Sequence, residues 1–381
     1  MIPDRATLAR LREQASQARQ AGHYPQAAHL ERQAVELAGT LGLTGERSRA
    51  LLWEGYSRRQ AGEDDLALAV LLQAIQEPAT DPADRFSALI AILHLSLERK
   101  SARFCRALLE QGRRDLVALR QPWSAPLDFL EGELALRRGD FAAAWDWHER
   151  AWRGRQATGP RLTAATQLWA QCRTAFRRHD RAELERIADQ LTELRPNSVI
   201  ERQVVMRAQW LRWRAQCAAT GSNIHSVAAP VEQAREFLSR VANEGESRDF
   251  GARLEALRVA ALAGDRDRID AALRCQPLDP DTFATALGLG DLALARARAA
   301  LELPAVDDDY GVTPVDARPA LVKANSAPGS ADWPEAARHY QSALKLAREQ
   351  DQRLETDWYS ATVHQRLALL DRAGRVRADG A

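Results

Sequence analysis

One stretch of the chain has the letters of a nucleotide-binding loop. In Gly288-Leu289-Gly290-Asp291-Leu292-Ala293, two glycines and an alanine stand at the spacing of a dinucleotide fingerprint. That fingerprint binds a pyrophosphate only where a strand leads into the loop and a helix starts directly after it. The preceding residues, Thr282–Leu287, have a helical pattern instead. We therefore interpret the glycines as a turn between two helices, and we predict no bound cofactor.

Side chains for metal binding or catalysis are scattered along the chain. The eight histidines form no HExxH motif, and no two of the four cysteines form a CxxC pair. Asp307, Asp308 and Asp309 lack the alternating ligands of a calcium loop, so we interpret them as a solvated loop. Nucleophile, P-loop and catalytic-triad signatures are absent as well. We expect no metal site and no catalytic residues, and therefore a protein that is not an enzyme.

Arginine and tryptophan are concentrated in the middle of the chain. Residues 99–214 carry 23 basic and 14 acidic side chains, although the whole chain has a formal net charge of +1. Seven of the ten tryptophans lie in the same stretch. One interpretation is a surface on which arginines and indole rings bind an acidic peptide or nucleic-acid bases. The other, which we favour, is that tryptophan fills gaps between helices while arginine covers their outer faces.

Small residues recur at fixed distances and define a repeated helical hairpin. Gly22, Gly62, Gly139 and Ala331 are the anchors of this comb. Each anchor has a small residue seven positions before it and alanines five and twelve positions after it: Ala15, Gly55, Gly132 and Ala324; Ala27, Ala67, Ala144 and Ala336; Ala34, Ala74, Ala151 and Ala343. Helices pack closely only where side chains are small, so the comb predicts a repeated helix–helix contact.

The comb resembles that of the tetratricopeptide repeat. Its clearest copy is GELALRRGDFAAAWDWHERAW, in which the turn glycine Gly139 and the aromatic Phe141 precede the two alanines. The interval from Gly22 to Gly62 is 40 residues, against about 34 in the common repeat. This longer period is similar to that of the repeat arrays in large bacterial regulators of the MalT type. The resemblance implies an all-α, right-handed superhelical solenoid of antiparallel helix hairpins, with about eight or nine repeats.

Helical periodicity divides the chain into paired helices. The predicted hairpins are Thr7–Gly39, Arg47–Gln76, Asp84–Leu119, Leu127–Trp152, Leu162–Leu194, Ile200–Asn243, Asp249–Arg274 and Asp281–Leu303. The eighth hairpin is expected to turn at Gly290. We assign residues 1–303 to the repeat array, 304–330 to a proline-rich acidic loop, 331–374 to a final repeat and a capping helix that ends at Gly374, and 375–381 to a flexible tail.

The chain also has the sequence features of a cytoplasmic bacterial protein. Its N-terminal residues carry charges where a secretory signal would be apolar, and its longest apolar stretch, Phe86–Leu97, is too short to cross a bilayer. Arginine supplies nearly all of the basic residues, a bias that is typical of GC-rich bacterial genomes. We expect a cytoplasmic protein that has no membrane partner.

In tetratricopeptide repeats, the first helix of each hairpin lines a concave groove that binds proteins or peptides. The resemblance implies that this groove includes Arg12, Arg19, Leu52, Glu133 and Leu136, and that its partner-binding residues are Tyr56, Arg59, Phe129, Trp169, Arg173 and Phe176. Trp169, Arg173 and Phe176 share one helical face, so we expect an exposed tryptophan beside an arginine.

The resemblance thus implies a scaffold or adaptor that binds a protein or an acidic peptide in an aromatic, arginine-rich groove. Two alternatives stay open. One is a bacterial regulator that senses a small ligand or a peptide. The other, with weaker support, is nucleic-acid binding through the basic middle of the chain, which a strong dependence of affinity on salt would reveal.

Overall fold

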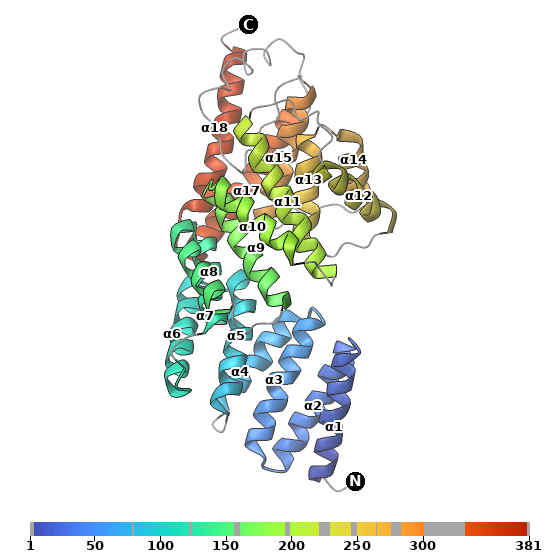
Figure 1. The fold of residues 1–381 in the computed structure, drawn as a ribbon, viewed down its shortest axis with the longest axis vertical. Coiled ribbons are helices and arrows are strands. Elements are labelled where there is room, and N and C mark those ends of the chain that lie inside the picture. Colours follow the sequence, from blue (N-terminus) through green and yellow to red (C-terminus); the bar gives the residue numbers. More distant parts are fainter. Residues whose placement is uncertain are drawn as a thin grey trace. The chain divides into compact units, whose positions relative to one another are not determined.

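The structure, a computed structural model, describes residues 4–77, 80–121, 124–155, 161–194, 199–220, 229–244, 250–263, 265–275, 283–300 and 332–378. Within these ranges the chain forms 17 helices and no strand, which confirms the all-α prediction for them (Figure 1). Helices that follow one another in sequence pack against each other. None of the described helices combines the length and the apolar content needed to cross a membrane. The predicted loop 304–330 and the anchor Ala331 lie outside the described residues.

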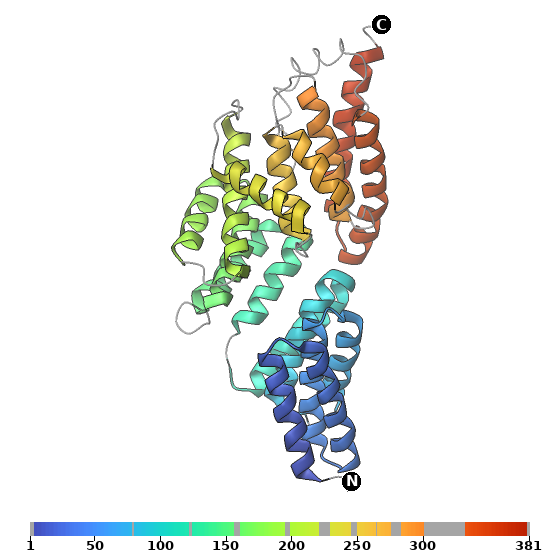
Figure 2. The same ribbon diagram turned by 90° about the vertical axis from the view of Figure 1, so that its right-hand side faces the viewer.

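The helices form two compact units, Met1–Leu134 and Ala135–Ala381, which are divided within α7 (Ala125–Arg137). The other helices of unit 1 are α1 (Arg5–Gln20), α2 (Tyr24–Thr40), α3 (Thr44–Gln60), α4 (Asp64–Gln76), α5 (Pro82–Arg99) and α6 (Ala102–Ala118). From α1 to α6, each helix packs against the next one (Figure 2). The first three predicted hairpins are therefore confirmed as helix pairs.

The first turns of unit 1 repeat one geometry. Gly22, Gly42 and Gly62 lie at equal intervals of 20 residues, and their φ angles are positive, at 78°, 67° and 80°. At each turn, the glycine and the residue after it donate backbone hydrogen bonds to the preceding helix; the Glu63 N–H, for example, donates to the Arg58 carbonyl at 2.9 Å. Glycine adopts this left-handed conformation without Cβ strain, so it ends one helix and lets the next begin. One helix with its turn thus occupies 20 residues, and one hairpin occupies 40.

The small-residue comb lies in the interfaces between helices. At Gly55, an added Cβ would come within 2.5 Å of the Leu71 side chain, so α3 and α4 approach too closely for a larger residue. The comb alanines of the described residues are at most 1% exposed: Ala15, Ala27, Ala34, Ala67, Ala74, Ala144, Ala151, Ala336 and Ala343. The predicted close contact between helices is confirmed at these positions.

Unit 2 continues from the end of α7. Its other described helices are α8 (Phe141–Arg155), α9 (Arg161–Arg177), α10 (Arg181–Glu193), α11 (Val199–Thr220), α12 (Ala229–Glu244), α13 (Phe250–Leu262), α14 (Arg266–Cys275), α15 (Phe283–Ala300), α17 (Asp332–Leu354) and α18 (Trp358–Ala378). The fourth to seventh predicted hairpins correspond to the pairs from α7–α8 to α13–α14. The core of this unit includes the fully buried Trp210, whose indole N–H donates to the Pro230 carbonyl at 3.1 Å.

The predicted eighth hairpin is wrong, because α15 runs without a break through Gly288 and Gly290. Both glycines are needed for packing between helices and not for a turn. A Cβ at Gly288 would lie 2.5 Å from the Leu254 side chain, and one at Gly290 would overlap the ring of Tyr340. These residues therefore form a helix interior, which is not the loop that a dinucleotide fingerprint requires.

The last helix, α18, is longer than predicted. It continues through Gly374 to Ala378, so the expected helix end at Gly374 is wrong. Its apolar residues pack with those of α15 and α17, where Val363 and Tyr340 are both fully buried. Within the described residues, α18 thus covers apolar surface of the preceding helices, as a capping helix does.

Candidate functional site

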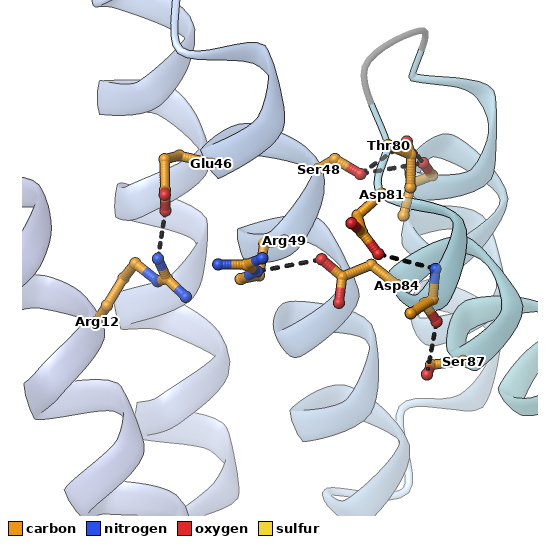
Figure 3. A network of polar contacts seen from close by, with 10 residues as sticks. Arg12, Glu46, Ser48, Arg49, Thr80, Asp81, Asp84 and Ser87 are labelled. Atoms are coloured by element: carbon orange, nitrogen blue, oxygen red, sulfur yellow. Dashed lines mark hydrogen bonds and ion pairs between the residues drawn. The ribbon is translucent and has the colours of Figure 1, made fainter. Parts of the chain in front are cut away.

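Ion pairs tie the first helices of unit 1 together. Arg12 of α1 pairs with Glu46 of α3, and the Arg49 guanidinium of α3 lies 3.1 Å from the carboxylate of Asp84 in α5 (Figure 3). Partly exposed pairs of this kind contribute only about 0.2–1 kcal/mol each to stability. Their importance is positional, because they hold α1, α3 and α5 in a fixed order.

Equivalent ion pairs also hold the second and third hairpins. Arg47 lies 2.7 Å from Glu77, and Arg85 lies 3.0 Å from Asp115. In both hairpins, 30 residues separate the arginine from its acid. The third hairpin has no glycine anchor in its sequence. It nevertheless forms the same kind of ion pair, at the same spacing, as the second hairpin.

The start of α5 is fixed by side-chain hydrogen bonds (Figure 3). The Ser48 hydroxyl donates to the Thr80 hydroxyl at 2.8 Å, which connects α3 to the segment before α5. The Asp81 carboxylate accepts a hydrogen bond from the Ala83 N–H at 2.8 Å and so caps the helix. These contacts determine where α5 begins, and therefore where its side chains lie relative to α3.

Six side chains from four helices lie next to one another in a row, which we call the first-helix row: Arg19, Trp53, Tyr56, Arg59, His94 and Phe129. The Arg19 guanidinium carbon is 4.5 Å from the centre of the Trp53 ring, and the Trp53 and Tyr56 ring centres are 5.9 Å apart. Arg59 follows Tyr56 by one helical turn and acts electrostatically on His94. The His94 and Phe129 ring centres are 6.1 Å apart. The structure thus brings together the predicted residues Tyr56, Arg59 and Phe129.

Trp53 gives the first-helix row an exposed aromatic ring. Its side chain is 37% exposed, whereas most large hydrophobic residues of the described chain are buried or half-buried. Arg19 lies over this ring and forms an ion pair with Glu31 of α2, which is fully buried. Burial raises the pKa of Glu31, even though the Arg19 guanidinium lowers it. A buried carboxylate therefore fixes a cation over the indole ring.

Arg59 is a half-buried cation that has no carboxylate partner among the residues the structure describes. Its guanidinium makes no hydrogen bond and no ion pair within the described part of the chain. Five other half-buried arginines of unit 1 pair with an acid, namely Arg12, Arg19, Arg47, Arg58 and Arg85. Withdrawing a charge from water without a partner is costly. The guanidinium N–H groups of Arg59 can therefore donate hydrogen bonds for which the described residues provide no acceptor.

His94 of α5 is a half-buried imidazole between Arg59 and Phe129. Burial and, to a smaller extent, the Arg59 charge lower the pKa of His94 to about 4, and Glu133 opposes this effect. The ring is therefore neutral at pH 7, with one N–H donor and one acceptor nitrogen. Neither nitrogen has a hydrogen-bond partner among the described residues.

The predicted site residues of unit 2 lie in its hydrophobic core. Trp169 is 9% exposed and Phe176 is 2% exposed, and both belong to one buried cluster. Arg173 lies 5.8 Å from the centre of the Trp169 ring, as their shared helical face predicts. Arg207 and Arg214 of α11 also lie over the Trp169 and Phe176 rings, at 4.6 and 4.9 Å. The expectation of an exposed tryptophan beside Arg173 is therefore not met, and these rings have a packing role.

Unit 2 also contains buried charges that pair with one another. Arg214 is fully buried and pairs with Glu255 of α13. The buried Asp291 of α15 accepts a hydrogen bond from the Tyr340 hydroxyl at 2.9 Å and lies 3.5 Å from the Arg366 guanidinium. These charges connect helices within the unit, in contrast to Arg59.

Trp53 and His94 were not among the predicted site residues. Trp53 precedes Tyr56 by three residues on α3, so a shared helical face could have identified it. His94 had no such signal, because the turn of its hairpin lacks the glycine from which positions were counted.

No protein-family model matches the chain, and no curated protein sequence matches it. Among the residues that the structure describes, no group of three or more His, Cys, Asp or Glu side chains could hold a metal ion. The chemistry of the candidate site therefore rests on aromatic rings, one unpaired guanidinium and neutral hydrogen-bonding groups.

Proposed function

We propose that the protein is a scaffold or adaptor, and not an enzyme, that binds a protein or peptide along the first-helix row. The observation that supports this best is the unused hydrogen-bonding capacity of the row. The Trp53 indole N–H, the Tyr56 hydroxyl, the Arg59 guanidinium and the His94 ring nitrogens have no hydrogen-bond partner within the described residues. A partner that supplies acceptors, donors and apolar groups would satisfy all of them at once.

In the core of unit 2, side chains of the same types have hydrogen-bond partners. There, the indole N–H of Trp210 donates to a backbone carbonyl, and the hydroxyl of Tyr340 donates to Asp291. Buried polar groups are normally paired in this way. A half-exposed row in which most polar groups lack partners within the described residues is typical of a recognition surface, where aromatic and arginine side chains provide most of the binding energy.

The resemblance to tetratricopeptide repeats supports the same surface. In that family the first helices line the binding groove, and the row consists of side chains from α1, α3, α5 and α7, which are the first helices of four hairpins. A regulator that senses a peptide would use the same row. We infer that the family's mode of binding applies to unit 1.

Nucleic-acid binding through the basic middle has weaker support. Many arginines between residues 99 and 214 pair with carboxylates of the same chain, as Arg113 does with Glu131 and Arg181 with Glu185. Such pairs reduce the positive charge that is left for phosphates. A partner bound through phosphates would lose affinity steeply as salt rises, whereas a partner bound through aromatic contacts would not.

The test is selection of peptides by the full chain from a random display library, followed by calorimetric titration of the selected peptides. Trp53→Ala should weaken binding about tenfold or more, because truncation of a central aromatic anchor removes much of the binding energy. The control is Leu66→Ala, since Leu66 lies on α4 outside the row and is 53% exposed. It should leave the affinity unchanged. Equal affinities of the wild type and Trp53→Ala would reject the row as the binding surface.

A further inference from the structure

We propose that Arg59, His94 and Tyr56 form a subsite for a single carboxylate, supplied by an acidic side chain of the bound peptide. This inference rests on the proposed function, since it assigns a ligand group to one part of the first-helix row. It starts from the contrast between two neighbouring residues of α3. Arg58 lies 2.8 Å from Glu54 and 2.6 Å from Glu63, whereas Arg59 has no acid within the described residues.

The three side chains together offer the donors that a carboxylate accepts. Arg59 presents a planar fork of N–H groups, which matches the two oxygens of a carboxylate. Tyr56 lies one helical turn before Arg59 and has an unpartnered hydroxyl. His94 is neutral and provides one N–H without adding a second charge.

The charge balance around the subsite favours a monoanion. Glu133 of α7 is 6% exposed and lies close enough to His94 to act on its ionisation. Two other cations on α1 and α3, Arg19 and Arg58, are already paired with Glu31 and Glu54. Within the described residues, Arg59 is one unpaired cation, and the nearby Glu133 adds no positive charge, so the subsite can accept at most one negative charge. A phosphate dianion would require a second free cation.

Aromatic rings flank the subsite on the same row. The exposed Trp53 ring lies 5.9 Å from the Tyr56 ring, and the Phe129 ring lies 6.1 Å from the ring of His94. A peptide that places its carboxylate at Arg59 would therefore have apolar side chains next to these rings. The geometry points to an acidic residue between two apolar residues as the recognised segment.

The experiment compares two short peptides, N-acetyl-Phe-Glu-Leu-amide and N-acetyl-Phe-Gln-Leu-amide, on the full chain. Their ends are blocked, so that only the first peptide contains a carboxylate. Affinity is measured by calorimetry, and the His94 ring is followed by NMR, with its signal assigned through His94→Gln. We expect the Glu peptide to bind about tenfold more tightly than the Gln peptide, as for a charge-assisted contact. It should also raise the pKa of His94, because it screens the Arg59 charge.

Two variants show whether Arg59 is responsible. Arg59→Gln should abolish the preference for the Glu peptide and should raise the pKa of His94 in the free chain. Arg103→Gln removes the same charge from an exposed position of α6 outside the row, and it should keep the preference. Together, these results would establish the subsite.

Other outcomes separate the subsite from the proposed function. Equal affinities for the two peptides, a preference that persists in Arg59→Gln, or no effect of millimolar Glu peptide on the His94 signal would each overturn the subsite. If library-selected peptides still bind and depend on Trp53 in that case, the proposed function stands without the subsite. If no selected peptide depends on Trp53, the proposed function fails as well.

Discussion

The hydroxyl of Thr356 donates a hydrogen bond to the carbonyl oxygen of Arg138 at 2.8 Å, although 218 residues separate the two along the chain. The Arg138 guanidinium in turn donates to the Leu354 carbonyl at 3.2 Å. The turn between α17 and α18 therefore docks on the turn that follows α7, where Trp358 packs against Gly139. These contacts join the first and last described elements of unit 2.

This docking predicts an unusually large effect of Gly139→Ala. Gly139 has a φ of 77°, and an added Cβ would also lie 2.6 Å from the Trp358 ring. The two effects together should lower the free energy of unfolding by about 2–4 kcal/mol, measured by urea titration. Gly62→Ala is the control, because Gly62 has a φ of 80° and nothing within 4 Å of an added Cβ. It should cost only about 1 kcal/mol.

The background of Trp358→Ala isolates the contact from the backbone strain. In that background, Gly139→Ala should cost no more than Gly62→Ala does in the wild type, because the ring is gone. Equal costs of the two glycine substitutions in the wild type would mean that Trp358 does not pack on Gly139 in solution.

The small-residue comb predicts a position-specific effect within α8. Ala144 is fully buried, whereas Ala142 two residues earlier is exposed on the same helix. Ala144→Glu should destabilise the protein by about 3 kcal/mol or more, because it places a carboxylate between packed helices. Ala142→Glu introduces the same charge and should be nearly neutral. Thermal unfolding followed by circular dichroism tests the pair, and similar melting temperatures for both variants would contradict the helix contact.

The environment of His94 predicts a dependence of stability on pH. The pKa of His94 is lowered to about 4 by burial and by Arg59, against about 6.5 for an unperturbed imidazole. Below about pH 6.5, the unfolded chain binds a proton that the folded chain does not, so His94 lowers the free energy of unfolding as the pH falls towards 4. The full effect is at most about 3 kcal/mol.

Urea unfolding at about pH 7.5 and about pH 5 measures this term. The stability difference between the wild type and His94→Gln should shift in favour of the variant at the lower pH. His29→Gln serves as the control, because His29 is exposed on α2. An identical pH dependence in the wild type and His94→Gln would show that the imidazole is not shielded from water.

Local sequence patterns predicted the turns correctly where the cause of the turn lies in neighbouring residues. A glycine at a helix end, such as Gly62, needs only its own left-handed conformation to form a turn. Gly290 is also followed by an acidic residue, but it lies inside α15 because Tyr340 packs against it. The contact that decides its role comes from a helix about fifty residues further along the chain, which periodicity does not reveal.

The candidate site was predictable to the same extent. Counting from glycine anchors placed Tyr56, Arg59 and Phe129 correctly on first helices, because each hairpin repeats the same packing. The same counting could not show that Trp169 and Phe176 are covered, since the covering groups belong to another helix. Helical spacing determines which residues share a face, but burial depends on what packs against that face.

The bond between Thr356 and Arg138 also has a consequence for the order in which the protein is made. The packing within unit 1 joins helices that are neighbours in sequence, so this unit can fold while later residues are still inside the ribosome. Unit 2 cannot make its contact with Arg138 and Gly139 until the turn between α17 and α18 has left the exit tunnel. The nascent chain therefore carries an unfinished second unit until this turn has been made, and chaperones would have their longest opportunity to bind there.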